Sequence, residues 1–65
     1  MRVRDLKYAR MRAGIKQYEM ARMLGIGQGT LSSMELGRTP MPKDLRQKIE
    51  EIIRAERQKL AAQTA

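Results

Sequence analysis

The 65-residue sequence contains no cysteine and no histidine. Without cysteine it has neither a disulfide nor a thiolate metal site. Without histidine it lacks the commonest metal ligand and the commonest general base. No clustered pair of carboxylates takes their place, so we expect no metal site, no cofactor and no enzymatic activity. A domain this small buries little of its surface, so its stability must come from close helix packing, from dimerisation, or from both.

Long apolar runs are also missing from the sequence. No stretch approaches the length of a membrane span. The N-terminal segment MRVRDLKYAR is basic but has no apolar core of the kind that signal peptides carry. We therefore expect a soluble cytoplasmic protein that associates with the nucleoid and not with a membrane.

Negative charge is scarce. The 7 Asp and Glu side chains face 14 Lys and Arg side chains, which gives a net charge of +7 and a pI near 10.6. Most of this excess lies in residues 1–38, which carry eight basic and three acidic side chains. A pI above 9 is typical of nucleic-acid-binding modules, but a basic chain can also bind an acidic protein or a membrane surface.

Glycine and proline are few, and they divide the chain into helical segments. Glycine occurs at 14, 25, 27, 29 and 37, and proline at 40 and 42. This punctuation predicts a helix ending near Gly14, short helices at about 17–24 and 28–36, and a last helix over 43–60. No alternation of β-branched residues predicts a strand. We expect one all-α domain over residues 1–60 and a frayed tail at 61–65.

Two of the predicted helices carry a charged residue on an otherwise apolar stripe. The first stripe holds Val3, Leu6, Arg10 and Ala13, and the second holds Leu31, Met34 and Glu35. A charge on a core stripe needs a partner, and Glu35 is the only acid of residues 1–38 on an inward stripe. The spacing therefore predicts an ion pair between Arg10 and Glu35. The alternative is that both side chains reach water at the helix ends.

The last predicted helix is long for so small a domain. An unbroken helix over 43–60 would measure about 27 Å at 1.5 Å per residue. We expect its far end to extend past the core and to meet a second subunit. The expected dimer contacts are Leu45, Ile49, Ile52, Ile53 and Leu60.

The stretch LGIGQGTLSSME contains three alternating glycines and suggests a phosphate-binding loop. A dinucleotide-binding loop, however, needs G-x-G-x-x-G directly after a strand, and a Walker loop needs Gly-Lys-Ser/Thr. The preceding segment YEMARML is typical of a helix, and GQGT has no lysine. The glycines therefore fit better in a tight turn between two helices that cross steeply.

A helix-turn-helix motif makes specific demands on a sequence. It needs a small residue midway along its first helix, which Ala21 supplies, and a left-handed residue in the turn, which Gly25 supplies. It also needs apolar residues at fixed positions, and here these are Met20, Leu24, Ile26, Leu31 and Met34. All of these positions agree with a helix-turn-helix motif over residues 17–36.

The segment QYEMARMLGIGQGTLSSMELG resembles the lambda-repressor-like, or Xre-type, helix-turn-helix family, and the resemblance covers about residues 3–53. It implies a small domain of four helices, or of five where the family's short fifth helix forms. The helix that begins at Gln28 resembles the recognition helix that enters the major groove. Many members of the family are homodimeric repressors that bind palindromic operators.

Individual positions match the family as well. Gln17 matches a residue that contacts a phosphate and braces the glutamine at 28. Arg10 and Glu35 match a buried ion pair, and Arg38 with Thr39 matches a loop that contacts the DNA backbone.

The sequence departs from the family pattern at three places. Gly27 stands where the family has a capping Ser or Thr, and Gly29 stands where the family has a side chain. One extended helix replaces the short fifth helix, so the family's usual dimer contact does not carry over.

The expected recognition helix contains no Lys or Arg, so the common arginine–guanine contact is not available from it. Gln28 can read adenine through paired hydrogen bonds, and Gly29 would let the helix sit close to DNA. The expected base contacts are Gln28, Gly29, Ser32 and Ser33, although the serines can also be simply solvated. The expected backbone contacts are Gln17, Thr30, Arg38, Lys16, Arg22 and Lys43, together with the arginines at the start of the chain.

These observations favour a sequence-specific transcriptional regulator, a repressor, that binds palindromic double-stranded DNA as a homodimer. One alternative is a DNA-binding antitoxin or another protein-interaction module that binds a protein partner through the C-terminal helix. The other is a membrane-surface or general RNA-binding protein.

Overall fold

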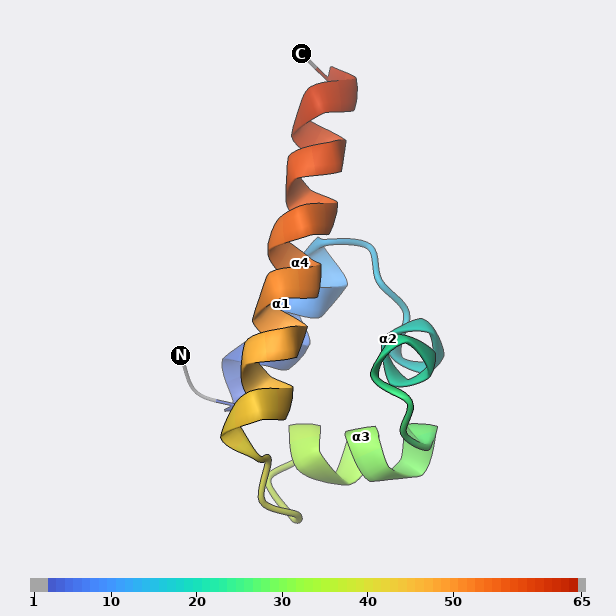
Figure 1. Cartoon of the computed structure of the whole chain (residues 1–65), viewed down its shortest axis with the longest axis vertical. Coiled ribbons are helices and arrows are strands. Elements are labelled where there is room, and N and C mark those ends of the chain that lie inside the picture. Colours follow the sequence, from blue (N-terminus) through green and yellow to red (C-terminus); the bar gives the residue numbers. More distant parts are fainter. Residues whose placement is uncertain (1–2, 65) are drawn as a thin grey trace.

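The computed structural model describes residues 3–64, and these residues form four α-helices and no strand (Figure 1). The helices are α1 (Val3–Arg12), α2 (Gln17–Leu24), α3 (Gln28–Glu35) and α4 (Lys43–Thr64). The all-α fold with a long last helix is therefore confirmed. The expected position of the Val3 side chain on the α1 stripe and the expected role of Arg2 lie outside what the structure describes.

The three short helices each end at a glycine with left-handed backbone geometry. The φ angles of Gly14, Gly25 and Gly37 are 76°, 71° and 79°. After α2, the Gly25 N–H donates to the Arg22 carbonyl and the Ile26 N–H to the Ala21 carbonyl, at 3.1 and 3.0 Å. These bonds satisfy carbonyl groups that the helix itself leaves without partners. The turn geometry predicted for Gly25 is thus present.

The α4 helix is longer than the sequence predicted. It begins directly after Pro42 and continues to Thr64, so the helix includes residues 61–64. Ala61 and Ala62 have the highest helix propensity of any residue type, and no glycine or proline follows them. At 1.5 Å per residue, its 22 residues span about 33 Å, and its upper turns extend past the other helices in Figure 1. No helix within residues 3–64 is long and apolar enough to cross a membrane.

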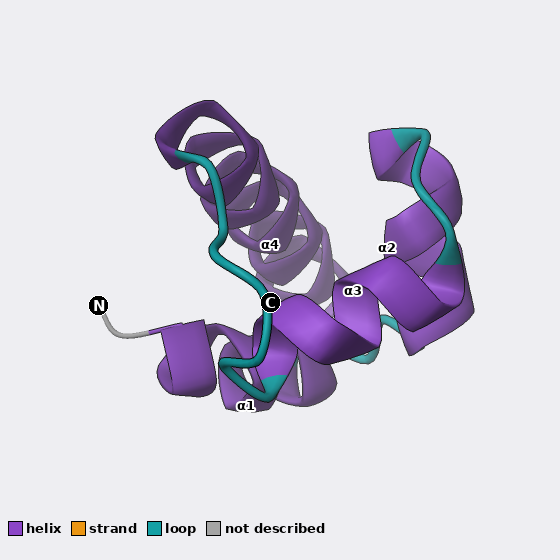
Figure 2. Ribbon diagram, turned by 90° about the horizontal axis from the view of Figure 1, so that it is seen from below, coloured by secondary structure: helices purple, strands orange, loops and turns teal. Residues whose placement is uncertain are grey.

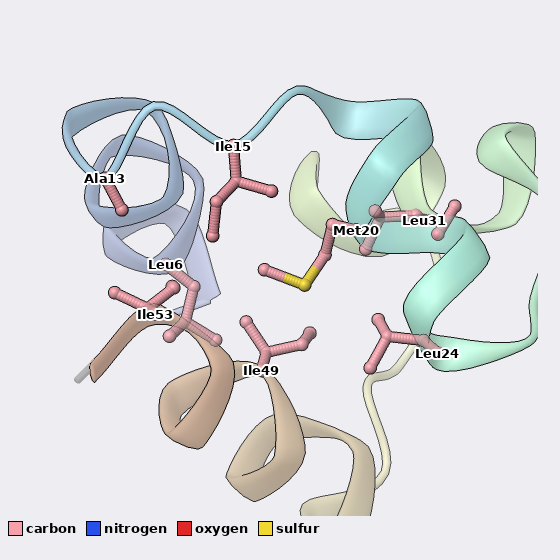
Figure 3. Close-up of a cluster of buried hydrophobic side chains, with 9 residues drawn as sticks. Leu6, Ala13, Ile15, Met20, Leu24, Leu31, Ile49 and Ile53 are labelled. Atoms are coloured by element: carbon pink, nitrogen blue, oxygen red, sulfur yellow. The ribbon is translucent and has the colours of Figure 1, made fainter. Parts of the chain in front are cut away.

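The core lies where the first half of α4 packs against α1 and α2 (Figure 3). Met20 and Leu31, from the two helices of the predicted motif, are completely buried. Figure 3 places the Met20 side chain in the middle of the cluster, where an unbranched flexible chain can fill an irregular space. The cluster consists of Leu6, Ala13, Ile15, Met20, Ala21, Leu24, Leu31, Ile49 and Ile53.

The apolar residues of α4 serve mainly this core, which corrects part of the expected dimer contact. Ile49 and Ile53 are only 3% and 6% exposed, so they do not present a surface to a second subunit. Leu45 and Ile52 are partly buried against the same core. Of the residues expected to mediate dimerisation, only Leu60 is largely accessible, at 41%.

The α3 helix crosses one end of the molecule. In Figure 1 it lies across the lower end, and in Figure 2, seen from below, it is in front, with α4 rising behind it. Its inner face buries Leu31, Met34 and Glu35, as the sequence predicted. The opposite face of α3 is therefore directed away from the core.

Candidate nucleic-acid interface

The outward face of α3 is uncharged and only partly covered by side chains. Gln28, Gly29 and Thr30 are exposed, whereas Ser32 and Ser33 are partly buried. Gly29, Ser33 and Leu36 are four and three residues apart, so they share one side of the helix. Leu36 is 56% exposed, and the sequence reasoning missed it as a surface residue. Its spacing from Gly29 is the signal that could have identified it.

Gly27 and Gly29 differ from the three glycines that end helices, because neither has a positive φ. A Cβ atom added at Gly29 would meet nothing within 4 Å, and one at Gly27 would meet only the Thr30 Oγ1 atom at 3.7 Å. The chain's own packing therefore has room for a side chain at both positions. Their effect is to leave the backbone bare on either side of Gln28.

Arg10 of α1 and Glu35 of α3 are brought together inside the protein. The Arg10 Nε atom lies 2.9 Å from Glu35 Oε2, and the two side chains are only 7% and 5% exposed. Arg10 Nη2 also donates to Glu35 Oε1 at 3.4 Å, and Arg10 Nη1 donates to the Ile15 carbonyl at 2.7 Å. One guanidinium group thus connects α3 to α1 and to the segment that leads into α2.

Gln17 extends this set of hydrogen bonds to the protein surface. Its Nε2 atom donates to Glu35 Oε1 at 2.8 Å, and its Oε1 atom accepts from Gln28 Nε2 at 3.2 Å. The resemblance implied that Gln17 braces Gln28, but nothing in the sequence indicated the contact between Gln17 and Glu35. Every buried side-chain nitrogen or oxygen within residues 3–64 has a hydrogen-bond partner.

The start of α2 holds Gln17 in place. Gln17 is the first residue of the helix, and the preceding Lys16 N–H donates to Glu19 Oε1 at 3.2 Å. A side-chain acceptor three residues into a helix stabilises the helix start in this way. The Gln17 side chain therefore extends from a defined point of the backbone toward both Glu35 and Gln28.

Four lysines and arginines expected to contact phosphates are exposed. Lys16 precedes α2, Arg22 lies on α2, Arg38 follows α3, and Lys43 begins α4. The Arg22 guanidinium lies 5.9 Å from the centre of the Tyr18 ring, close enough for a cation–π contact. Positive charge thus occurs before and after α3 in the chain, whereas the outward face of α3 is uncharged.

Comparison with known protein families matches residues 6–53 to the Helix-turn-helix family. No curated protein and no solved structure gives a significant match. The matched segment contains Arg10, Gln17, Gln28 and Glu35, together with the half of α4 that packs in the core. The chain therefore belongs to the lambda-repressor-like helix-turn-helix family of DNA-binding regulators.

Proposed function

We propose that the chain is a transcriptional repressor that places α3 in the major groove and reads a base with Gln28. The hydrogen bond between Gln17 and Gln28 supports this role most directly, because it holds the only long amide side chain of α3 at its exposed end. The major groove admits an α-helix, and glutamine pairs with adenine through the N6 and N7 atoms of that base. Repression would follow from occupancy, since a bound domain excludes other proteins from the same DNA.

The remaining outward residues of α3 are proposed to shape the contact. The bare backbone at Gly29 allows the helix to approach the base pairs closely, and Ser32 and Ser33 can donate to or accept from several bases. Leu36, exposed on the same face as Gly29, is suited to an apolar contact with a thymine methyl group.

We propose that most of the affinity for DNA comes from contacts with its phosphate groups. Because α3 has no Lys or Arg, the positive charge must act from its surroundings, and neutralised phosphates release counterions. Phosphate contacts position the protein but carry no sequence information. The proposed contacts are Lys16, Gln17, Arg22, Thr30, Arg38 and Lys43.

The proposed DNA-bound form is a symmetric dimer, because one helix with few base contacts specifies only a short site. Its contact would involve the turns of α4 beyond the core, near Leu60. The same turns could instead bind a different protein, as in a DNA-binding antitoxin. This second role is favoured only by the observation that α4 extends past the core and exposes Leu60.

The experiment compares Gln28→Ala with Arg38→Ala on a duplex selected by the wild-type protein from a random pool and on every single-base variant of it. Gln28→Ala should lose about 1–3 kcal/mol on the selected duplex and lose the preference at one base pair of each half-site. Arg38→Ala is the matched control and should weaken binding to all duplexes about equally.

A Gln28→Ala protein with the wild-type preference profile would contradict direct readout by Gln28. Sequence preference would then have to come from the shape of the DNA or from the N-terminal arginines.

A further inference from the structure

We infer that the buried Arg10–Glu35 pair determines which atoms of Gln28 face the DNA, and that it thereby sets the preference for adenine over guanine. This inference rests on the proposed function, because it assumes that Gln28 contacts a base. Glu35 and Arg10 are buried and act through Gln17, so they are positioning residues and not contact residues.

The charge on Glu35 sets the orientation of the first amide. A carboxylate paired with a guanidinium can only accept hydrogen bonds. Gln17 must therefore turn its Nε2 atom, and not its Oε1 atom, toward Glu35, and the distance of 2.8 Å is that of a good hydrogen bond. Arg10 donates to both carboxylate oxygens at the same time, which holds the Glu35 side chain in place.

The orientation of Gln17 then sets the orientation of the second amide. With its Nε2 atom directed at Glu35, Gln17 turns its Oε1 atom, which is an acceptor, toward Gln28. Gln28 must therefore donate from its own Nε2 atom, at 3.2 Å. The Oε1 atom of Gln28 and the second hydrogen of its Nε2 atom remain available to DNA.

One acceptor beside one donor matches adenine better than guanine. Adenine presents the N6 amino donor and the N7 acceptor in the major groove, whereas guanine presents two acceptors, O6 and N7. A free glutamine could satisfy guanine with both amide hydrogens, but Gln28 has already given one of them to Gln17. The pair thus selects against guanine by limiting the donors that reach the DNA.

The test measures the ratio of dissociation constants for two duplexes that differ by an adenine-to-guanine change at the base pair read by Gln28. In Glu35→Gln the partner of Gln17 can either donate or accept, so the orientation is no longer imposed. In Gln17→Met the ion pair stays intact and the connection to Gln28 is lost. The wild-type ratio should be about 5- to 150-fold, and both variants should reduce it at least about fivefold.

Ile53→Val is the matched control for loss of stability, because Ile53 lies in the core and makes none of these hydrogen bonds. It should weaken both duplexes by the same factor and leave the ratio unchanged. A folded Glu35→Gln protein with the wild-type ratio of dissociation constants would overturn the inference. This holds also if Gln17→Met lowers the ratio, because the buried pair would then play no part in it.

If Glu35→Gln fails to fold, hydrogen exchange in the wild-type protein tests the inference instead. Its 15N–1H spectrum should show a slowly exchanging side-chain amide hydrogen on Gln17, and rapid exchange of both hydrogens would overturn the inference. A wild-type ratio in Gln28→Ala would contradict the proposed function instead, so the two failures are distinguishable.

Discussion

Replacing Arg10 by methionine should bring the domain close to unfolding. The substitution leaves Glu35 inside the protein with Gln17 as its remaining side-chain donor, and it removes the donor to the Ile15 carbonyl. Breaking one partner of a well-buried ion pair costs about 3–5 kcal/mol. A domain of this length has a total unfolding free energy of about 3–10 kcal/mol, at 0.05–0.15 kcal/mol per residue.

The double variant Arg10→Met/Glu35→Leu should recover most of this loss. It buries no uncompensated charge, and apolar residues of similar volume often replace a buried ion pair without loss of stability. The unfolding free energy of the double variant should still be about 1 kcal/mol below that of the wild type. The Ile15 carbonyl has lost its bond from Arg10, and the Gln17 Nε2 atom has lost its bond to Glu35. Each single variant should lose about 3–5 kcal/mol and the double variant about 1 kcal/mol, so the expected coupling energy between the two positions is about 5 kcal/mol or more.

Urea unfolding followed by far-UV circular dichroism measures all four proteins of this cycle. Arg46→Met is the matched control, because it removes a partly exposed pair with Glu50 at 3.7 Å, and it should cost about 0.3–0.5 kcal/mol. An Arg10→Met protein as stable as the control, or a cycle without coupling energy, would refute the role given to the pair.

Three further predictions concern binding, the glycines and the distal turns of α4. DNA affinity should fall steeply between about 50 and 200 mM salt, because bound phosphates release counterions, and a flat log–log slope measured by fluorescence anisotropy would contradict DNA binding. Gly29→Ala should raise the thermal unfolding midpoint by about 2–8 °C yet weaken DNA binding, and unchanged DNA affinity would argue against close approach. Gly37→Ala should lower the midpoint, because its φ is 79°. Leu60→Gln should weaken self-association in sedimentation experiments, and a wild-type chain that stays monomeric at high concentration would exclude the dimer.

The fold and the buried pair were accessible from the sequence because local rules determine them. Gly25 and Gly37 end helices through backbone geometry that other residues rarely adopt. Arg10 and Glu35 each stand on an apolar stripe, and the chain offers few other partners for a charge buried there. Both features follow from spacing within single helices, which the sequence displays directly.

The contact between Gln17 and Glu35 could not be predicted in the same way. The two residues are 18 positions apart, and neither spacing nor polarity distinguishes this glutamine from a solvated one. The stripe on α4 posed a related problem, because spacing reveals that Ile49 and Ile53 face an apolar surface but not whose surface it is. The three-dimensional packing assigns them to the chain's own core.

The central claim is that the outer face of α3 contacts DNA, and the most direct test is the 15N–1H spectrum of the labelled protein with and without a selected duplex. The largest shifts should fall on the backbone amides of residues 28–33 and on the side-chain amide of Gln28. Smaller shifts should appear at Lys16, Arg22 and Arg38. Shifts confined to residues 54–64 of α4, with α3 unchanged, would contradict the claim.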